Sequence, residues 1–165
     1  KSYFKKHKDL NPQFIFALPG LNVRNNELGA ILGINQLNRL DKNIKKRNQN
    51  HIYFLNKINK SKFYTDFDLS GSSNYAFNLI MKEKNIKFAN KLMKNLTKNE
   101  IEFRRGSVGG GNQLRQPYLK EFLKKNELQK YPITEHVHFF GFYLGNYPDL
   151  SKKNIDFICK IINET

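Results

Sequence analysis

The chain has 165 residues, 39% of them hydrophobic, including 14 Phe and 8 Tyr, which is enough for one packed domain. No apolar run approaches the roughly 18 residues of a membrane span, and the start, KSYFKKHKDL, lacks the apolar segment of a signal peptide. The net charge of +15 would suit nucleic-acid binding, but acidic residues interrupt the basic ones, so we expect solvated helix faces instead.

A single cysteine, Cys159, excludes an internal disulfide and any metal site built from several cysteines of this chain. It fits a reducing compartment, and we expect a cytoplasmic protein. Cys159 falls on the inner face of a predicted helix, where it acts as a small buried apolar residue. The first residue, Lys1, is not Met, and we expect a cut inside a longer chain.

The first half of the chain is predicted to be mostly helical. Residues 13–18, which are apolar from Phe14 on, predict a strand. A long helix follows over about 26–59, either continuous or broken near Asp41, and Asn25 or Asn26 caps its start. The apolar residues at helical spacing that would form its inner face are Leu28, Ile31, Leu32, Leu37 and Leu40.

The second half alternates between strands and helices, which predicts an α/β fold with helices packed on a short, mixed or antiparallel sheet. We expect a loop at 61–73 first. The strand at 74–82 would turn Tyr75, Phe77, Leu79 and Met81 to one side. The remaining predicted elements are a helix at 86–99, a strand at 101–105, a helix at 118–126 opened by Pro117, a helical turn at 134–139, a strand at 140–144 and a helix at 152–163 capped by Ser151.

The first candidate binding loop is Gly20-Leu-Asn-Val-Arg24. Gly20 allows a turn that is closed to residues with a Cβ. Asn22 offers an amide donor at the loop tip, and Arg24 offers a guanidinium for a carboxylate or phosphate. The alternative is a structural turn, with Asn22 bonded to the backbone and Arg24 paired with Glu27.

The second candidate binding loop follows Arg104 and Arg105 and contains the run Gly109-Gly-Gly-Asn-Gln-Leu-Arg-Gln116. Glycines bring backbone N–H groups close to an anion. Polar groups able to hold a hydroxylated, phosphorylated ligand are added by Asn112, Gln113, Arg115 and Gln116. The alternative is a mobile surface loop. The glycine spacing and the missing Lys exclude a P-loop.

A His-x-His pair, His136 and His138, could bind a metal, with Glu135 or His51 as a third ligand. A packing role is the simpler interpretation, and we assign no metal. The spacing supports no Ser-His-Asp or Cys-His arrangement.

These loops, taken together, resemble the DegT/DnrJ/EryC1/StrS family, which comprises pyridoxal-phosphate-dependent nucleotide-sugar aminotransferases and their dehydratase relatives. The segment similar to the one after the family's catalytic lysine is Gly20–Arg24 with Glu27, Ala30, Gly33, Gln36, Leu37, Leu40 and Asp41. The resemblance continues over nearly the whole chain, through residues 75–81, 102–105, 116–118 and 148–151.

The resemblance implies the C-terminal portion of an aspartate-aminotransferase (type I) fold, with residues 1–40 ending the large cofactor domain and 41–165 forming the small domain. It implies a homodimer with a shared active site, and pyridoxal 5'-phosphate or pyridoxamine 5'-phosphate bound mainly by an upstream domain. Asn22 matches the asparagine that reaches the cofactor phosphate of the partner subunit, and Arg24 would support the same loop.

One branch of the family is closer than the rest. The segment RRGSVGGGNQLRQPYL is similar to a loop of nucleotide-sugar 3-dehydratases that act on 4-keto-6-deoxyhexoses, in which Gly-Asn-x-x-Arg-Gln-Pro is typical. By that match Arg105, Asn112 and Arg115 contact the sugar or diphosphate, and His138 is a further candidate. The cluster-dependent dehydratases carry cysteines in the region matching residues 20–50, which has none here.

In this family the catalytic Lys, or the His that replaces it in dehydratases without a cluster, lies upstream, so we assign no catalytic residue. The hypothesis is a fragment, inactive alone, of an aminotransferase or 3-dehydratase that acts on a nucleotide-linked 4-keto-6-deoxy sugar in surface-polysaccharide or deoxysugar biosynthesis. One alternative is a nucleic-acid-binding module with exposed aromatics, although Phe77 and Phe157 fall at core-like positions. Another is a remnant that only dimerises.

Overall fold

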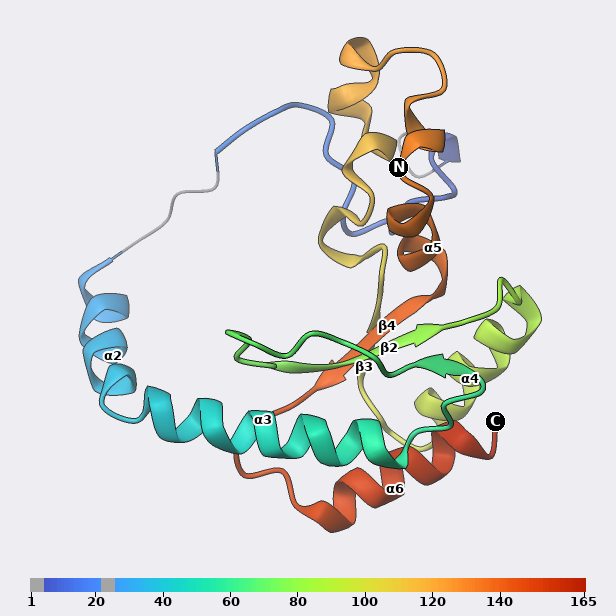
Figure 1. The fold of residues 1–165 in the computed structure, drawn as a ribbon. Helices are drawn as coiled ribbons and strands as arrows, with labels where there is room; N and C mark the ends of the chain where they lie inside the picture. Colours follow the sequence, from blue (N-terminus) through green and yellow to red (C-terminus); the bar gives the residue numbers. More distant parts are fainter. Residues whose placement is uncertain (1–4, 22–25) are drawn as a thin grey trace.

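A computed structural model of the chain describes residues 5–21 and 26–165 (Figure 1). A small sheet lies at the centre, with α3, α4 and α6 on one side of it; α5 and several short 3-10 turns lie at the other end beside the N-terminal segment. The helices and strands are α2 (Glu27–Leu37), α3 (Leu40–Lys57), β1 (Phe63–Tyr64), β2 (Ala76–Met81), α4 (Ile86–Lys98), β3 (Phe103–Arg105), α5 (Pro132–Phe140), β4 (Gly141–Gly145) and α6 (Lys152–Asn163).

The sheet has the strand order β1-β2-β4-β3, and every neighbouring pair is antiparallel. Leu144 of β4 lies opposite Phe77 of β2 and opposite Phe103 of β3. Since β2 and β3 both run against β4, they are parallel to each other, and α4 makes the crossover that parallel strands need. The predicted α/β fold is confirmed, and the sheet is antiparallel between neighbours.

The core lies between the sheet and the three helices that cover it. Leu92 and Leu96 of α4 are fully buried, and Phe54 of α3 stacks on Phe77 of β2 at 4.4 Å between ring centroids. The predicted inner face of α6 is confirmed by its buried residues, Ile155, Cys159 and Ile162. The Ser151 side chain caps this helix by accepting a hydrogen bond from the Asn154 N–H at 3.1 Å.

Two aromatic residues expected to face the core do not. Tyr75 precedes β2 and is 66% exposed, and Phe157 of α6 is 48% exposed. Phe157 lies between the buried residues Ile155 and Cys159, so helical geometry turns it partly outward. Tyr75 lies outside the strand, so the alternation of β2 does not apply to it.

Three predicted elements differ in the structure. Residues 13–18 contain no strand, and β1 falls inside the predicted loop at 61–73. The segment from Pro117 forms 3-10 turns instead of the predicted helix. The 3-10 turns are η1 (Val108–Gly110), η2 (Gln113–Arg115), η3 (Pro117–Phe122) and η4 (Glu127–Lys130).

The predicted long helix takes the second of its two expected forms, with a break near Asp41. The helix α2 ends at Leu37, and α3 begins at Leu40.

The helix α2 has the predicted cap but not the predicted packing. The Oδ1 atom of Asn26 accepts a hydrogen bond from the Gly29 N–H at 2.8 Å. The apolar face predicted to be internal is exposed, because no part of the described chain covers it (Figure 1). Its exposed residues are Leu28, Ile31, Leu32 and Leu37, with Leu40 at the start of α3.

None of the helices in the described ranges has both the length and the apolar character that crossing a membrane requires.

Candidate functional site

Three of the residues predicted to bind ligand come together in space. Asn112 and Arg115 lie at the start and end of the turn η2, and His138 lies in the last turn of α5. Asn22 and Arg24, the predicted cofactor contacts, lie outside the described residues.

Two glycines allow the loop to lie directly against α5. The Gly106 N–H donates to the carbonyl of Gly141 at 2.7 Å, and a Cβ at Gly106 would lie 1.9 Å from the Val137 carbonyl oxygen. Gly111 has a φ of +57°, and a Cβ there would lie 2.3 Å from Nδ1 of His138. Gly111, one of the glycines predicted to bring backbone close to an anion, thus brings it close to α5.

His138 is the buried centre of this contact, with 1% of its surface exposed. Its Nδ1 accepts a hydrogen bond from the Asn112 N–H at 3.1 Å, so the proton is assigned to Nε2, which donates to the carbonyl of Asp9 at 2.9 Å. Burial lowers the pKa of His138, the bond to Asp9 partly opposes this, and the charge of Arg115 lowers the pKa further. The imidazole is therefore neutral at pH 7.

Neither histidine of the His-x-His pair is arranged for a metal. His138 uses both ring nitrogens within the protein, and Nε2 of His136 lies 2.6 Å from the carbonyl of Met81. His51 lies instead in the core beside Phe77, with ring centroids 6.0 Å apart. Within residues 5–21 and 26–165, no group of three possible ligands is placed to hold a metal ion.

Arg115 is held between two carboxylates. Its Nε donates to Oε1 of Glu135 at 2.6 Å, and its second terminal nitrogen also contacts Glu135. Its other terminal nitrogen, Nη1, donates to Oδ2 of Asp9 at 2.5 Å, and the guanidinium lies 4.9 Å from the ring centre of Phe139. Glu135 also accepts from the Asn112 side chain at 2.9 Å, so its two oxygens join both loop residues.

The charges of this cluster stabilise one another. Burial alone would lower the pKa of Arg115, but the hydrogen bonds with Glu135 and Asp9 hold the pKa above its usual value. Burial would raise the pKa of Asp9, but the bond from Arg115 lowers it below the usual range. Arg115 and Asp9 are therefore both ionised at neutral pH. With the formal charge of Glu135, the three side chains of the cluster sum to −1.

A segment that we name the strap, residues 9–16, is fastened to this loop. The Gln116 side chain accepts from the Phe16 N–H at 2.8 Å and donates to the Phe14 carbonyl at 2.9 Å. The Tyr118 N–H donates to the Phe16 carbonyl at 3.3 Å. The sequence analysis counted Gln116 among the groups able to hold a ligand. It did not identify Asp9 and Glu135 as the partners of Arg115 and Asn112, because no local pattern relates positions so far apart in the chain.

Two other predicted features stand apart. The Nε atom of Arg105, at the end of β3, is buried and has no hydrogen-bond partner among the described residues. Within those residues, neither a hydrogen bond nor an ion pair joins the Arg105 side chain to Asn112, Arg115 or His138. The expectation that Gly20 adopts a glycine-only turn is wrong: its φ is not positive, and a Cβ there would meet no atom within 4 Å.

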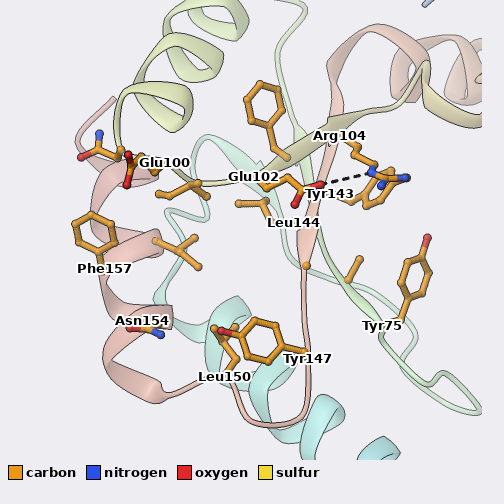
Figure 2. Close-up of a pocket in the computed structure, with 16 residues that line it drawn as sticks. Tyr75, Glu100, Glu102, Arg104, Tyr143, Leu144, Tyr147, Leu150, Asn154 and Phe157 are labelled. Carbon is orange, nitrogen blue, oxygen red and sulfur yellow. Dashed lines mark ion pairs between the residues drawn. The ribbon is translucent and has the colours of Figure 1, made fainter. Parts of the chain in front are cut away.

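Two hollows formed by the described residues bear on the candidate site. A hollow of about 260 Å³ lies beside the loop and α5, and its lining residues are Gly106, Gly111, Asn112, Ile133, Thr134, Val137 and His138. A larger hollow of about 620 Å³ lies elsewhere, with Tyr75, Tyr143 and Arg104 on one side and Asn154 and Phe157 of α6 on the other (Figure 2). The predicted ligand residues Asn112 and His138 line the smaller hollow, so size alone does not identify the candidate site.

Comparisons with a family profile and with curated proteins point to the same family. The sequence profile of the DegT/DnrJ/EryC1/StrS aminotransferase family matches residues 2–163. A GDP-4-keto-6-deoxy-D-mannose 3-dehydratase of Escherichia coli O55:H7 is 28% identical over 160 residues, which cover 96% of this chain and 40% of that protein. The enzyme of the same name from Yersinia pseudotuberculosis is 32% identical over 152 residues, covering 88% and 38%. The chain thus spans about two fifths of the curated relatives it matches.

Solved structures agree with the sequence matches. The E. coli GDP-4-keto-6-deoxy-D-mannose 3-dehydratase with bound hydrated pyridoxal phosphate is 28% identical, with a TM-score of 0.64 over 91% of this chain and 38% of that one. An aminotransferase from Psychrobacter cryohalolentis, 18% identical with a TM-score of 0.62 over 88% and 40%, shares the fold. These likenesses give no support to the nucleic-acid-binding alternative.

Proposed function

Since the chain belongs to the DegT/DnrJ/EryC1/StrS aminotransferase family, we propose that it is the C-terminal part of a pyridoxal-phosphate-dependent enzyme acting on a nucleotide-linked 4-keto-6-deoxy sugar. Residues 1–40 would end the cofactor domain and 41–165 would form the small domain. The whole enzyme would be a cytoplasmic homodimer in surface-polysaccharide or deoxysugar biosynthesis, and this part alone would be inactive.

The observation that carries the proposal is the meeting of Asn112 and His138 around one hollow, with Arg115 beside them. Amide and hydroxyl groups suit the hydroxyls of a sugar, and a guanidinium suits a diphosphate. The imidazole of His138, whose two nitrogens are bonded within the protein, would position the loop. The sequence of this loop favours the 3-dehydratase branch over the aminotransferases, and the two curated relatives described above carry the 3-dehydratase name.

The same hollow does not fit the reactive end of the cofactor. No lysine lines it, so it offers no amine for covalent attachment of an aldehyde. We therefore assign the cofactor to the upstream domain, with Asn22 and Arg24 as the contacts that this chain would add to its phosphate. When bound, the cofactor acts as an electron sink for the sugar chemistry, and the protein binds and orients the groups around it.

The chain's own residues would bind and orient the substrate. The neutral imidazole of His138, fixed by Asn112 and Asp9, keeps the glycine loop at a set distance from α5. Glu135 holds Asn112 and Arg115 in one arrangement beside the hollow, so the loop is already ordered before a ligand binds. Such preorganisation reduces the entropy lost on binding.

The proposal is tested by blocking each hollow in turn. Ile133 is 79% exposed at the rim of the smaller hollow, so Ile133→Trp should fill the rim without disturbing the core. Asn154→Trp is the matched control, because Asn154 lines the larger hollow. Calorimetric titration of the longer protein from this reading frame with GDP-mannose should show at least about tenfold weaker binding for I133W and unchanged binding for N154W. Loss of binding only in N154W would assign the ligand to the larger hollow and refute the proposed site.

A further inference from the structure

We propose that the Asp9 carboxylate occupies the one edge of the Arg115 guanidinium that a ligand could use, and that a diphosphate group competes for this edge and displaces Asp9 from it. The inference rests on the proposed function, in which this loop binds a nucleotide-linked sugar. It adds a regulating contact to that site, which would accept a phosphate only when the Asp9 side chain leaves.

Arg115 is prepared for a ligand on one edge only. Glu135 contacts Nε and one terminal nitrogen, and the guanidinium also lies against the ring of Phe139. The Arg115 side chain is only 21% exposed, so the surrounding contacts restrict its movement. The remaining terminal nitrogen, Nη1, is the donor that Asp9 occupies at 2.5 Å.

Asp9 is the more replaceable of the two carboxylates. Glu135 belongs to the first turn of α5, where an acidic residue is favoured, and both of its oxygens are bonded. Asp9 lies on a segment without helix or strand, and its side chain is 38% exposed against 24% for Glu135. Its backbone carbonyl is held separately by His138, so its side chain can turn away while the strap stays bound.

A diphosphate is the ligand chemistry that fits the vacated edge. Phosphate oxygens accept the same charge-assisted hydrogen bond from a guanidinium as a carboxylate does, and they carry more negative charge. With Asp9 in place the cluster of Asp9, Glu135 and Arg115 has a net charge of −1, which repels an anion. With Asp9 turned away the Arg115–Glu135 pair is neutral and one donor is free. The competition lowers the apparent affinity by the fraction of molecules in which the edge is free.

The test is calorimetric titration of the 165-residue chain with inorganic pyrophosphate. Asp9→Asn removes the competing charge and keeps the backbone carbonyl that binds His138. Asp149→Asn is the matched control, because it changes the net charge equally but removes a surface pair with Lys46. We expect D9N to bind pyrophosphate about fivefold more tightly than wild type, which corresponds to about 1 kcal/mol for a partly exposed ion pair. D149N should match wild type, and Arg115→Gln in the D9N background should abolish binding.

Equal affinities of D9N and D149N, or no pyrophosphate binding by D9N, would overturn the competition. Either result would leave the proposed substrate site to its own test with GDP-mannose, so the two failures are distinguishable.

Discussion

Replacing Gln116 by leucine should loosen the strap around Phe14 and Phe16 without unfolding the domain. Gln116 is fully buried, and its amide makes two hydrogen bonds to strap backbone, to the Phe16 N–H at 2.8 Å and to the Phe14 carbonyl at 2.9 Å. Leucine is close in volume but has no polar group. The change therefore removes the bonds while filling most of the space.

The magnitude follows from those two bonds. A hydrogen bond contributes about 1 kcal/mol net, so the strap should lose about 2 kcal/mol. At about 1.4 kcal/mol for each factor of ten, the equilibrium for local opening of the strap rises about 30-fold. The Tyr118 N–H still donates to the Phe16 carbonyl at 3.3 Å, which is long, and Asp9 still binds Arg115 and His138 at the other end of the strap. The opening is therefore local to the part of the strap around Phe14 and Phe16.

Amide hydrogen exchange measures this opening directly. The Phe16 amide should exchange about 30-fold faster in Gln116→Leu, while the amide of Leu96 in the core keeps its rate. Gln113→Leu is the control, because the Gln113 side chain contacts Tyr118 and Gly109 but not the strap. Unchanged exchange at Phe16, or equal acceleration at Leu96, would refute the role given to Gln116.

Three further predictions concern His51, the loop glycines Gly109 and Gly111, and Cys159. Burial holds the pKa of His51 below its ordinary value of 6.5, although the nearby backbone of Ala76 offsets part of the effect. The unfolded chain therefore binds more protons than the folded chain near this pH. The unfolding free energy measured in urea should fall as the pH drops below about 6.5, and it should fall less steeply in His51→Leu. An unchanged pH dependence in H51L would contradict this. Both Gly109 and Gly111 have positive φ, but only at Gly111 would a Cβ meet His138. Gly109→Ala adds only backbone strain of about 1 kcal/mol, so Gly111→Ala should lower the melting temperature clearly more than Gly109→Ala does. Equal shifts in scanning calorimetry would refute the close contact between Gly111 and His138. Burial raises the pKa of Cys159 to about 12, so iodoacetamide at about pH 8 should label the chain only after unfolding in guanidinium, and rapid labelling of native protein would show an accessible thiol.

Local patterns predicted the elements whose residues contact the core in a regular way. The spacing of Ile155, Cys159 and Ile162 and the cap at Ser151 predicted α6, and the alternation of Phe77 and Leu79 predicted β2. In each case the buried face follows the period of the element itself.

The same periodicity was misleading where nothing in the described chain covers the apolar face. Leu28 and Ile31 keep helical spacing and form a helix, yet they remain exposed. A periodic pattern shows that a face is apolar, but not which segment covers it. The run at 13–18 failed for a different reason, since side-chain bonds from Gln116 hold this segment instead of a neighbouring strand.

The candidate site was only partly visible in the sequence. The loop motif identified Asn112 and Arg115, and the structure places His138 beside them. Asp9 and Glu135 have no motif of their own, and Asp9 is 106 positions from Arg115. Contacts over such separations depend on the folded chain, so sequence spacing could not reveal that Arg115 is already paired.

The most direct measurement is the reaction of the longer protein encoded by this reading frame with GDP-4-keto-6-deoxy-D-mannose, pyridoxal phosphate and glutamate, followed by mass spectrometry of the sugar. Our account predicts a product that has lost the C3 hydroxyl, and loss of that product when Ile133 is replaced by Trp. A product with an amino group in place of the keto oxygen would assign the enzyme to the aminotransferase branch and contradict the preferred dehydratase reaction. An unchanged sugar, in a protein that binds the cofactor, would contradict the proposed substrate class.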